Sequence, residues 1–167
     1  MAGRRTGSGD GRAAADVWRS LFRIGIGVYW LYFAAQKWPA PFGLAPHGIG
    51  WMHPLMEQSA RTSPVPGLGQ LMAQLVLPNW QWFATGQAVA ETTVGALLIL
   101  GLATRPAALL ATLLALNLSL TVAFLDPDVG IRWLYYLPVL VSFEVFVNGG
   151  GAWALDRARG IPEWIRS

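Results

Sequence analysis

The chain contains no cysteine, a single lysine and only two histidines among its 167 residues. The lack of cysteine excludes disulfide scaffolds, thiol–disulfide catalysis, iron–sulfur ligation and cysteine-based zinc sites. The histidines, His47 and His53, do not have a metal-binding helical spacing, so we expect no metal site. The sequence also has neither a mid-helix histidine pair typical of haem ligation nor a glycine-rich phosphate loop.

Charge is scarce as well. Charged residues make up 13% of the chain and hydrophobic residues 54%, with a mean hydropathy of +0.41. Soluble domains carry about 25% charged residues, so an ordinary soluble globule is disfavoured. Intrinsic disorder requires low hydrophobicity and is excluded more firmly. The 12 basic residues, against 9 acidic ones, form neither a run nor a helical stripe, so we expect no nucleic-acid partner.

Four long apolar stretches dominate the rest of the chain, at residues 18–38, 80–102, 106–125 and 131–147. About 20 helical residues cross the hydrocarbon core of a bilayer, and tryptophan and tyrosine gather near the ends of these stretches, as at membrane interfaces. We therefore predict an all-α membrane protein, a bundle of four transmembrane helices. A soluble helical bundle is the weaker alternative, because nearly every helix would have to be apolar on all sides.

The arginine distribution predicts the orientation of this bundle. Basic residues cluster before the first stretch, between the second and third, and after the fourth: Arg4, Arg5, Arg12, Arg19, Arg105, Arg157, Arg159 and Arg166. Under the positive-inside rule both termini lie in the cytoplasm, in a bacterial-type inner membrane. We expect a disordered basic tail over 1–15, a membrane domain over 16–157 and a cytoplasmic tail over 158–167.

A long first loop, residues 39–79, separates the first two stretches. A structureless loop of this length is unusual in a compact protein. Within it, Leu68, Leu71, Met72, Leu75 and Val76 recur at the spacing of one helical face. We predict a short amphipathic helix over 67–77 that lies on the extracytoplasmic surface as a lid, and an earlier short helix over 53–60.

Two glutamates lie inside the apolar stretches, where an ionisable side chain is costly and therefore a functional candidate. Glu91 and Glu144 each lie 11 residues after a tryptophan near the start of their stretch, which places both about 16 Å along a helix. Gln87 and Asn148 are one turn from them, and Asn117 lies near the middle of the third stretch. We expect these groups to share one polar site inside the bundle.

Two interpretations of this site remain open. Polar side chains can join membrane helices by hydrogen bonds, which is the favoured interpretation for Asn117 and Gln87 alone. Burial disfavours a charged carboxyl group, and a glutamate tuned towards neutrality suits proton exchange. If Glu91 exchanges protons, Glu91→Gln should lower activity while the melting temperature holds or rises, and if Glu91 only neutralises a cation, the same change should lower stability.

Charged and aromatic residues also mark the helix ends. Arg23 is close to the inner end of the first stretch, where snorkelling to the interface and a functional role are equally favoured. Lys37, the sole lysine, lies where this stretch meets the expected lid, and its ammonium group would attract an anion or a quinone carbonyl. Trp80 and Trp82 offer a flat wall suited to a quinone ring, although an interfacial belt explains them equally well.

Three motifs in order resemble the DoxX/DoxD family of small four-helix membrane proteins. They are Arg23-Ile24-Gly25-Ile26-Gly27 followed by Lys37, Glu91 followed by Gly95 and Gly101-Leu102-Ala103-Thr104-Arg105, and NGGGAWALD ending at Asp156. The resemblance covers roughly residues 18–157. The long first loop and Pro78-Asn79 look closer to DoxD, the small membrane subunit of thiosulfate:quinone oxidoreductase.

This resemblance implies a membrane subunit that passes electrons from a sulfur anion such as thiosulfate to membrane quinone, its substrate, beside a second subunit. Glu91, Lys37 and Glu144 are then the candidate catalytic residues. The candidate quinone-binding residues are Arg23, Gln87, Trp80, Trp82, Asn117 and Asn148. A non-catalytic membrane scaffold for a partner enzyme and a small proton-coupled transporter are the alternatives, and a homo-oligomer is left open.

Overall fold

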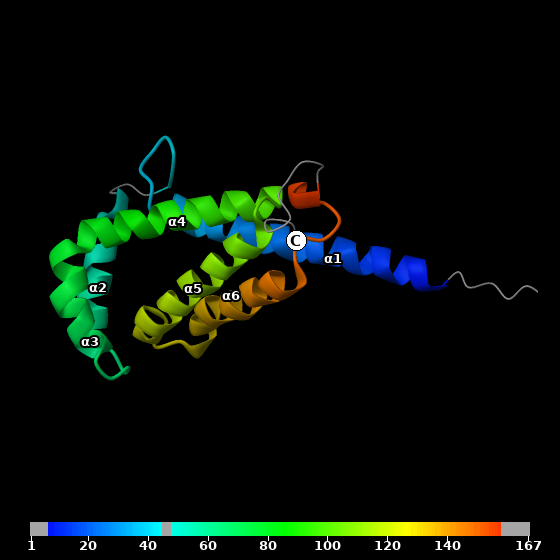
Figure 1. Cartoon of the computed structure of the whole chain (residues 1–167). Coiled ribbons are helices and arrows are strands. Elements are labelled where there is room, and N and C mark those ends of the chain that lie inside the picture. The colour runs from blue at the N-terminus through cyan, green and yellow to red at the C-terminus, as the bar shows by residue number, and fades with distance from the viewer. Residues whose placement is uncertain (1–6, 45–47, 158–167) are drawn as a thin grey trace, which may run out of the picture.

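The computed structural model describes residues 7–44 and 48–157, and the regular structure in these residues is helical. Four long helices form the bundle: α1 (Gly7–Ala35), α4 (Trp80–Leu100), α5 (Thr104–Thr121) and α6 (Val129–Asn148). They alternate in direction along the chain (Figure 1). We call the end that contains residues 101–104 and 149–157 the terminal end, and the end that contains residues 36–79 and 122–128 the cavity end.

The helices coincide with the four predicted apolar stretches. The third stretch continues beyond α5 through a short 3₁₀ turn, η4 (Ala123–Leu125). Helix α1 starts at Gly7, within the stretch expected to be a disordered tail, so residues 7–15 are helical. Residues 1–6 of that tail and the expected C-terminal tail, 158–167, lie outside the described residues.

Three helical segments of the described chain are long and apolar enough to cross a membrane: Leu68–Leu100, Thr104–Leu125 and Val129–Asn148. Helix α1 has sufficient length but is not one of them. Its sequence includes Asp16, Arg19 and Arg23, which lower its hydropathy. Over residues 7–44 and 48–157 the protein is therefore all-helical, with three candidate spans.

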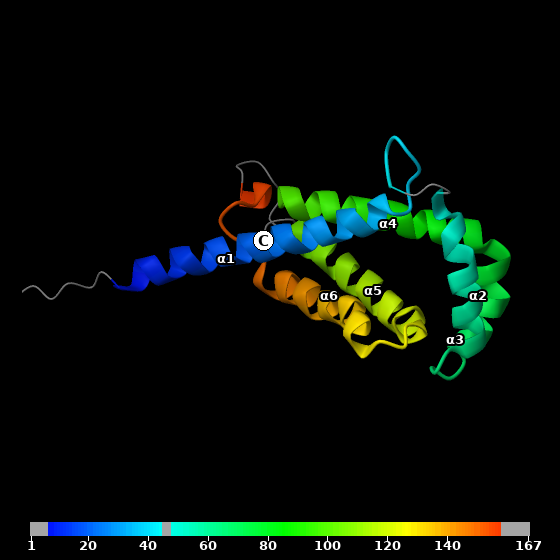
Figure 2. The same cartoon turned by 180° about the vertical axis from the view of Figure 1, so that it is seen from behind.

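The long connection before α4 is largely helical. It contains a 3₁₀ turn, η1 (Gly48–Trp51), then α2 (Met52–Thr62) and α3 (Leu68–Leu71). A π-helical turn, η2 (Met72–Val76), and a 3₁₀ turn, η3 (Leu77–Asn79), join α3 to α4 without a break, which gives one helical segment of 33 residues. Helices α2 and α3 run side by side at the cavity end (Figures 1 and 2). Both expected loop helices, over 53–60 and 67–77, therefore coincide with helical residues.

Small residues allow the helices to approach closely. A Cβ atom on Gly27 of α1 would lie 3.0 Å from the carbonyl oxygen of Gly95 in α4, so the two backbones nearly touch. Helix α5 similarly buries Ala107, Ala108 and Ala111 in the core. Such small-residue contacts are how membrane helices gain packing energy without a hydrophobic driving force.

Candidate functional site

A buried ion pair lies near the cavity end of the bundle. The Nζ atom of Lys37, just past the end of α1, lies 2.7 Å from Oε2 of Glu91 in the middle of α4. It also donates a 3.2 Å hydrogen bond to the carbonyl oxygen of Phe33. The Glu91 side chain is fully buried and that of Lys37 is 4% exposed. Water therefore barely screens this pair, and removing either partner would leave the other charge uncompensated.

Neighbouring groups fix both members of the pair. Gln87, one turn before Glu91 on α4, donates a 2.9 Å hydrogen bond to the second carboxylate oxygen of Glu91. The indole N–H of Trp38 donates a 2.9 Å bond to the hydroxyl of Thr92, which anchors the turn that carries Lys37 to the same helix. The carboxylate is thus held through both of its oxygens, as a buried polar network requires.

A cavity of about 620 Å³ opens beside this pair at the cavity end. Most of its wall is apolar, and the connection before α4 contributes several of the apolar side chains, including Met52, Leu55, Met56, Leu71, Met72 and Leu75. The polar side chains in its wall are Lys37, Ser59, Gln87, Asn117, Thr121 and Tyr135. An apolar cavity with a few polar groups is the usual form of a small-molecule site.

Lys37 lines this cavity and has donor capacity left over. An ammonium group has three N–H donors, and the bonds to Glu91 and Phe33 use two of them. The Nζ atom also lies 6.0 Å from the ring centroid of Phe33 and 5.9 Å from that of Trp51, within cation–π range. The site therefore offers a positive donor framed by aromatic rings.

The structure brings together four of the residues singled out from the sequence. Lys37, Gln87, Asn117 and Trp82 all line the cavity, and Trp82 is 81% exposed. Trp80 instead packs its ring against His53 of α2, with centroids 4.9 Å apart. His47 lies outside the described residues.

Glu144 and Asn148 form a separate pair, which corrects the expectation of one shared polar site. Asn148 donates a 3.1 Å hydrogen bond to the Glu144 carboxylate on the outer part of α6. Glu144 lies four residues before the end of α6, about 6 Å from the terminal end, whereas Glu91 is in the middle of α4. Helix α4 packs mainly against α1 and α5, so α6 does not present Glu144 to Glu91.

Arg23, a candidate quinone-binding residue in the sequence, lies at the terminal end and is absent from the lining of the cavity. Its guanidinium donates to four backbone carbonyls, those of Gly150 at 2.9 Å, Ile99 at 2.9 Å, Trp153 at 3.0 Å and Leu98. The residue is fully buried. The backbone thus occupies the donors that a ligand would need, and Arg23 joins α1 to the ends of α4 and α6.

Two features of the structure were not anticipated from the sequence. At the terminal end, Asp156 accepts hydrogen bonds from the backbone N–H groups of Ala103 at 2.7 Å and Thr104 at 2.8 Å, and so caps α5. At the cavity end, α2 contributes Met52, Leu55, Met56 and Ser59 to the cavity wall, and the buried Ser59 donates a hydrogen bond to the carbonyl oxygen of Thr121. The position of Asp156 in the closing motif was the sole signal for the first, and the sequence offered none for the second.

Comparison with known families gives one match. A family model described as DoxX matches residues 19–123, which include Arg23, Lys37, Gln87 and Glu91. Comparisons with curated proteins and with solved structures each gave no match. Because the matched region covers more than half of the 167 residues and contains the buried ion pair, the chain belongs to the DoxX family.

Proposed function

We propose that this DoxX protein is an integral membrane subunit of a quinone-linked oxidoreductase, and that the cavity beside Lys37 binds the quinone ring. One observation carries the proposal: a largely apolar cavity of about 620 Å³ borders the buried Lys37–Glu91 pair. A quinone is a flat apolar ring with two carbonyl acceptors, so it needs such a wall and a few well-placed donors.

Lys37 and Gln87 are the donors in this proposal. The third N–H of Lys37 donates to a quinone carbonyl, and the ion-paired ammonium makes this a charge-assisted bond. The rings of Phe33 and Trp82 supply flat apolar contacts in the same cavity wall. Asn117 provides a further amide on α5 for the second carbonyl.

Reduction of the quinone requires protons as well as electrons. Two thiosulfate anions lose one electron each and join through a new S–S bond as tetrathionate, and these two electrons, with two protons, convert one quinone into one quinol. Lys37 gives a proton to the reduced carbonyl oxygen, and the negative charge left on Glu91 then draws a replacement proton to the pair. We leave Glu144 out of this step because it lies apart, near the terminal end of α6.

The electron donor and its partner protein rest on the resemblance to DoxD. The chain has no cysteine with which to store electrons, so electrons pass to the quinone directly from the donor or through a second subunit. We propose the second subunit, with the sulfur anion arriving from the cavity end. The membrane in question is a bacterial-type inner membrane.

For the orientation we propose α1 as a fourth span, both termini in the cytoplasm and the helical residues within 67–77 as a lid over the outer mouth. Helix α1 runs alongside α4 over the length of the bundle (Figure 2). Arg105 and Arg157 lie at the terminal end, where the chain also enters and leaves the bundle. Single cysteines at positions 7 and 61 test this in the cysteine-free chain. Labelling of position 7 from the periplasm, or of position 61 only from the cytoplasm, would contradict it.

The binding experiment compares two equivalent substitutions. Glu91→Gln and Glu144→Gln each replace a carboxylate by an amide, but only Glu91 neighbours the cavity. Each purified protein is analysed for bound quinone and titrated with a short-chain quinone, with tryptophan fluorescence as the signal, since Trp51 and Trp82 line the cavity. We expect Glu91→Gln to lose quinone binding and quinone reduction, and Glu144→Gln to keep both.

Other outcomes would favour the alternatives. A stoichiometric partner protein that co-purifies without quinone would favour a scaffold, and proton-coupled uptake into liposomes would favour a transporter. Equal effects of Glu91→Gln and Glu144→Gln on quinone binding would contradict the assignment of the cavity as the site of the quinone ring. Replacing Leu71 and Leu75 by Asp tests the lid, because both line the cavity and we expect ligand binding to fall when they become charged.

A further inference from the structure

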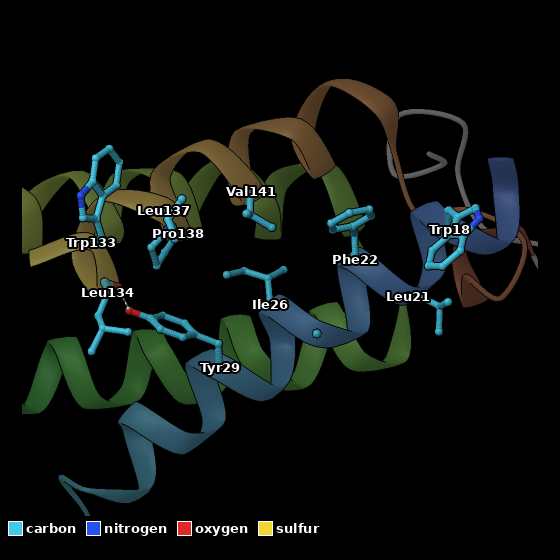
Figure 3. A pocket seen from close by; sticks show the side chains of 11 residues that line it. Trp18, Leu21, Phe22, Ile26, Tyr29, Trp133, Leu134, Leu137, Pro138 and Val141 are labelled. Carbon is cyan, nitrogen blue, oxygen red and sulfur yellow. Dashed lines mark hydrogen bonds between the residues drawn. The ribbon is translucent and has the colours of Figure 1, made fainter. Parts of the chain in front are cut away.

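We propose that the apolar groove between α1 and α6 holds the isoprenoid tail of the quinone whose ring occupies the cavity. This inference rests on the proposed function and adds a second subsite to it. The groove has a volume of about 410 Å³ and is lined along α1 from Trp18 to Tyr29 and along α6 from Trp133 to Val141 (Figure 3).

Two residues explain why α1 and α6 leave a groove between them. Gly25 on α1 has no side chain, and no atom lies within 4 Å of the position that a Cβ would occupy. Pro138 interrupts the hydrogen bonding of α6 because it has no N–H to donate to the carbonyl four residues earlier, that of Leu134. The hydroxyl of Tyr29 donates a 2.8 Å hydrogen bond to this same Leu134 carbonyl (Figure 3).

The groove ends at the wall of the cavity. The ring of Tyr29, in the groove, packs on that of Phe33, in the cavity wall, with centroids 4.6 Å apart. On α6, Leu134 lines the groove and the next residue, Tyr135, lines the cavity. The groove and the cavity therefore lie next to each other where the rings of Tyr29 and Phe33 meet. In this proposal the quinone binds with these two rings moved apart.

The apolar lining of the groove favours a hydrocarbon chain as its ligand. Apart from the Tyr29 hydroxyl, which is already bonded to Leu134, its wall is made of aromatic and aliphatic side chains and Gly25. From Trp18 to Tyr29 it extends for about 16 Å along α1. A helix with its side chains is about 10–12 Å across and would lie over such a groove, not within it. Contact with the ring cavity favours a quinone tail over a phospholipid chain.

Three glycines allow a matched test, since each has open space around its Cβ position: Gly25 in the groove, Gly86 in the cavity wall, and Gly11 outside both. Replacing each by Leu adds the same volume, and Leu favours a helix more than Gly does, so the variants should fold. Binding is measured for a long-tailed isoprenoid quinone and for a tail-less quinone with the same ring. Thermal unfolding checks that each variant remains folded.

We expect Gly25→Leu to weaken binding of the long-tailed quinone by roughly five- to tenfold, a modest change because lipid is as apolar as the groove. Its binding of the tail-less quinone should stay unchanged. Gly86→Leu should weaken both ligands, and Gly11→Leu neither. A photoreactive group on the tail should cross-link the wild-type protein at Phe22 or Leu137, as identified by mass spectrometry.

Three results would overturn the tail site alone, and the first two concern the tail itself. They are an unchanged preference for the long tail in Gly25→Leu, and tail cross-links confined to residues outside the groove. A phospholipid retained in the groove of protein that binds tail-less quinone would also overturn it, while the proposed function stands. If the wild-type protein binds neither quinone, the proposed function and the tail site both fail.

Discussion

The terminal end and the cavity end of the bundle each bury a cation from the same part of the chain, but they use it differently. At the terminal end, Arg23 donates to four backbone carbonyls. At the cavity end, Lys37 meets one carboxylate and one carbonyl and borders a cavity. A buried cation whose donors are used by the backbone holds helices together. One that keeps a donor beside a cavity is available to a ligand.

The residue types suit these two roles. The guanidinium of arginine has five N–H donors in a rigid fork and keeps its charge, so it can join several chain segments at once. The ammonium of lysine is compact and can release a proton. Exchanging the two residue types would therefore weaken the helix connections at the terminal end and remove the proton donor at the cavity end.

We expect the largest loss of stability from a substitution at the terminal end. Arg23→Ala would leave four carbonyls without their donor, and each buried unsatisfied group costs about 1–3 kcal/mol, so we expect little folded protein. Arg23→Lys should recover part of the stability, with three donors in place of five. Thermal unfolding in detergent measures both. Arg19→Ala is the control, because Arg19 is partly exposed and its ion pair with Asp16 is a surface pair. Near-normal stability of Arg23→Ala would contradict the structural role.

We expect the second largest loss of stability from a substitution at the cavity end. Glu91→Gln leaves Lys37 buried without its counter-charge, which typically costs about 3–5 kcal/mol. The observed pair therefore makes a loss of stability the expected result of Glu91→Gln, whether or not the pair also exchanges protons. The double variant Lys37→Met with Glu91→Leu should regain stability, since apolar pairs replace buried ion pairs well, yet should not bind quinone. If the double variant binds quinone normally, the pair belongs with Arg23 as a purely structural element.

A smaller loss of stability is expected from a second substitution at the terminal end, which also tests whether the two ends are coupled. Asp156→Asn keeps one acceptor oxygen but replaces the other by an NH2 group, so one of the bonds from Ala103 and Thr104 is lost, and the negative charge at the start of α5 is removed. We expect a loss of about 2 kcal/mol in the free energy of unfolding, from the lost bond to a charged group and the lost helix-end charge. Quinone binding at the far end of the bundle should be unchanged. A specific loss of binding in a stable Asp156→Asn protein would show that the two ends are coupled.

The smallest effect concerns the attachment of α2. Ser59 donates to the Thr121 carbonyl, and Ser59→Ala removes this bond at a cost of about 1 kcal/mol. Because the bond joins α2 to the end of α5, its loss should act locally. Hydrogen exchange should become faster in α2 than in α5, and bound quinone should dissociate faster. Uniform acceleration through the whole bundle would mean that α2 is part of the core.

The sequence predicted the helices well because apolar periodicity and proline positions decide them locally. It also identified Lys37, Gln87 and Glu91, but not the bond between Lys37 and Glu91, residues 54 positions apart. Helix rotation decides such a contact, and packing sets rotation. The expected depth of Glu144 rested on its distance from Trp133, but α6 already begins at Val129. Glu144 therefore lies closer to the terminal end than its distance from Trp133 indicates. The partners of Arg23 are backbone carbonyls, which leave no mark in a sequence.

The unbroken helical segment Leu68–Leu100 fixes a rotational phase between the cavity wall and the ion pair. Each helical residue turns the chain by about 100°, so one residue inserted at 77–79 would turn Leu71 and Leu75 away from the cavity while Glu91 kept its place. Helix α2, in contrast, is joined through the loop at 63–67, where an insertion leaves its phase unchanged. We therefore expect an insertion just before α4 to disrupt the cavity wall, and an insertion in the loop before α3 to be tolerated.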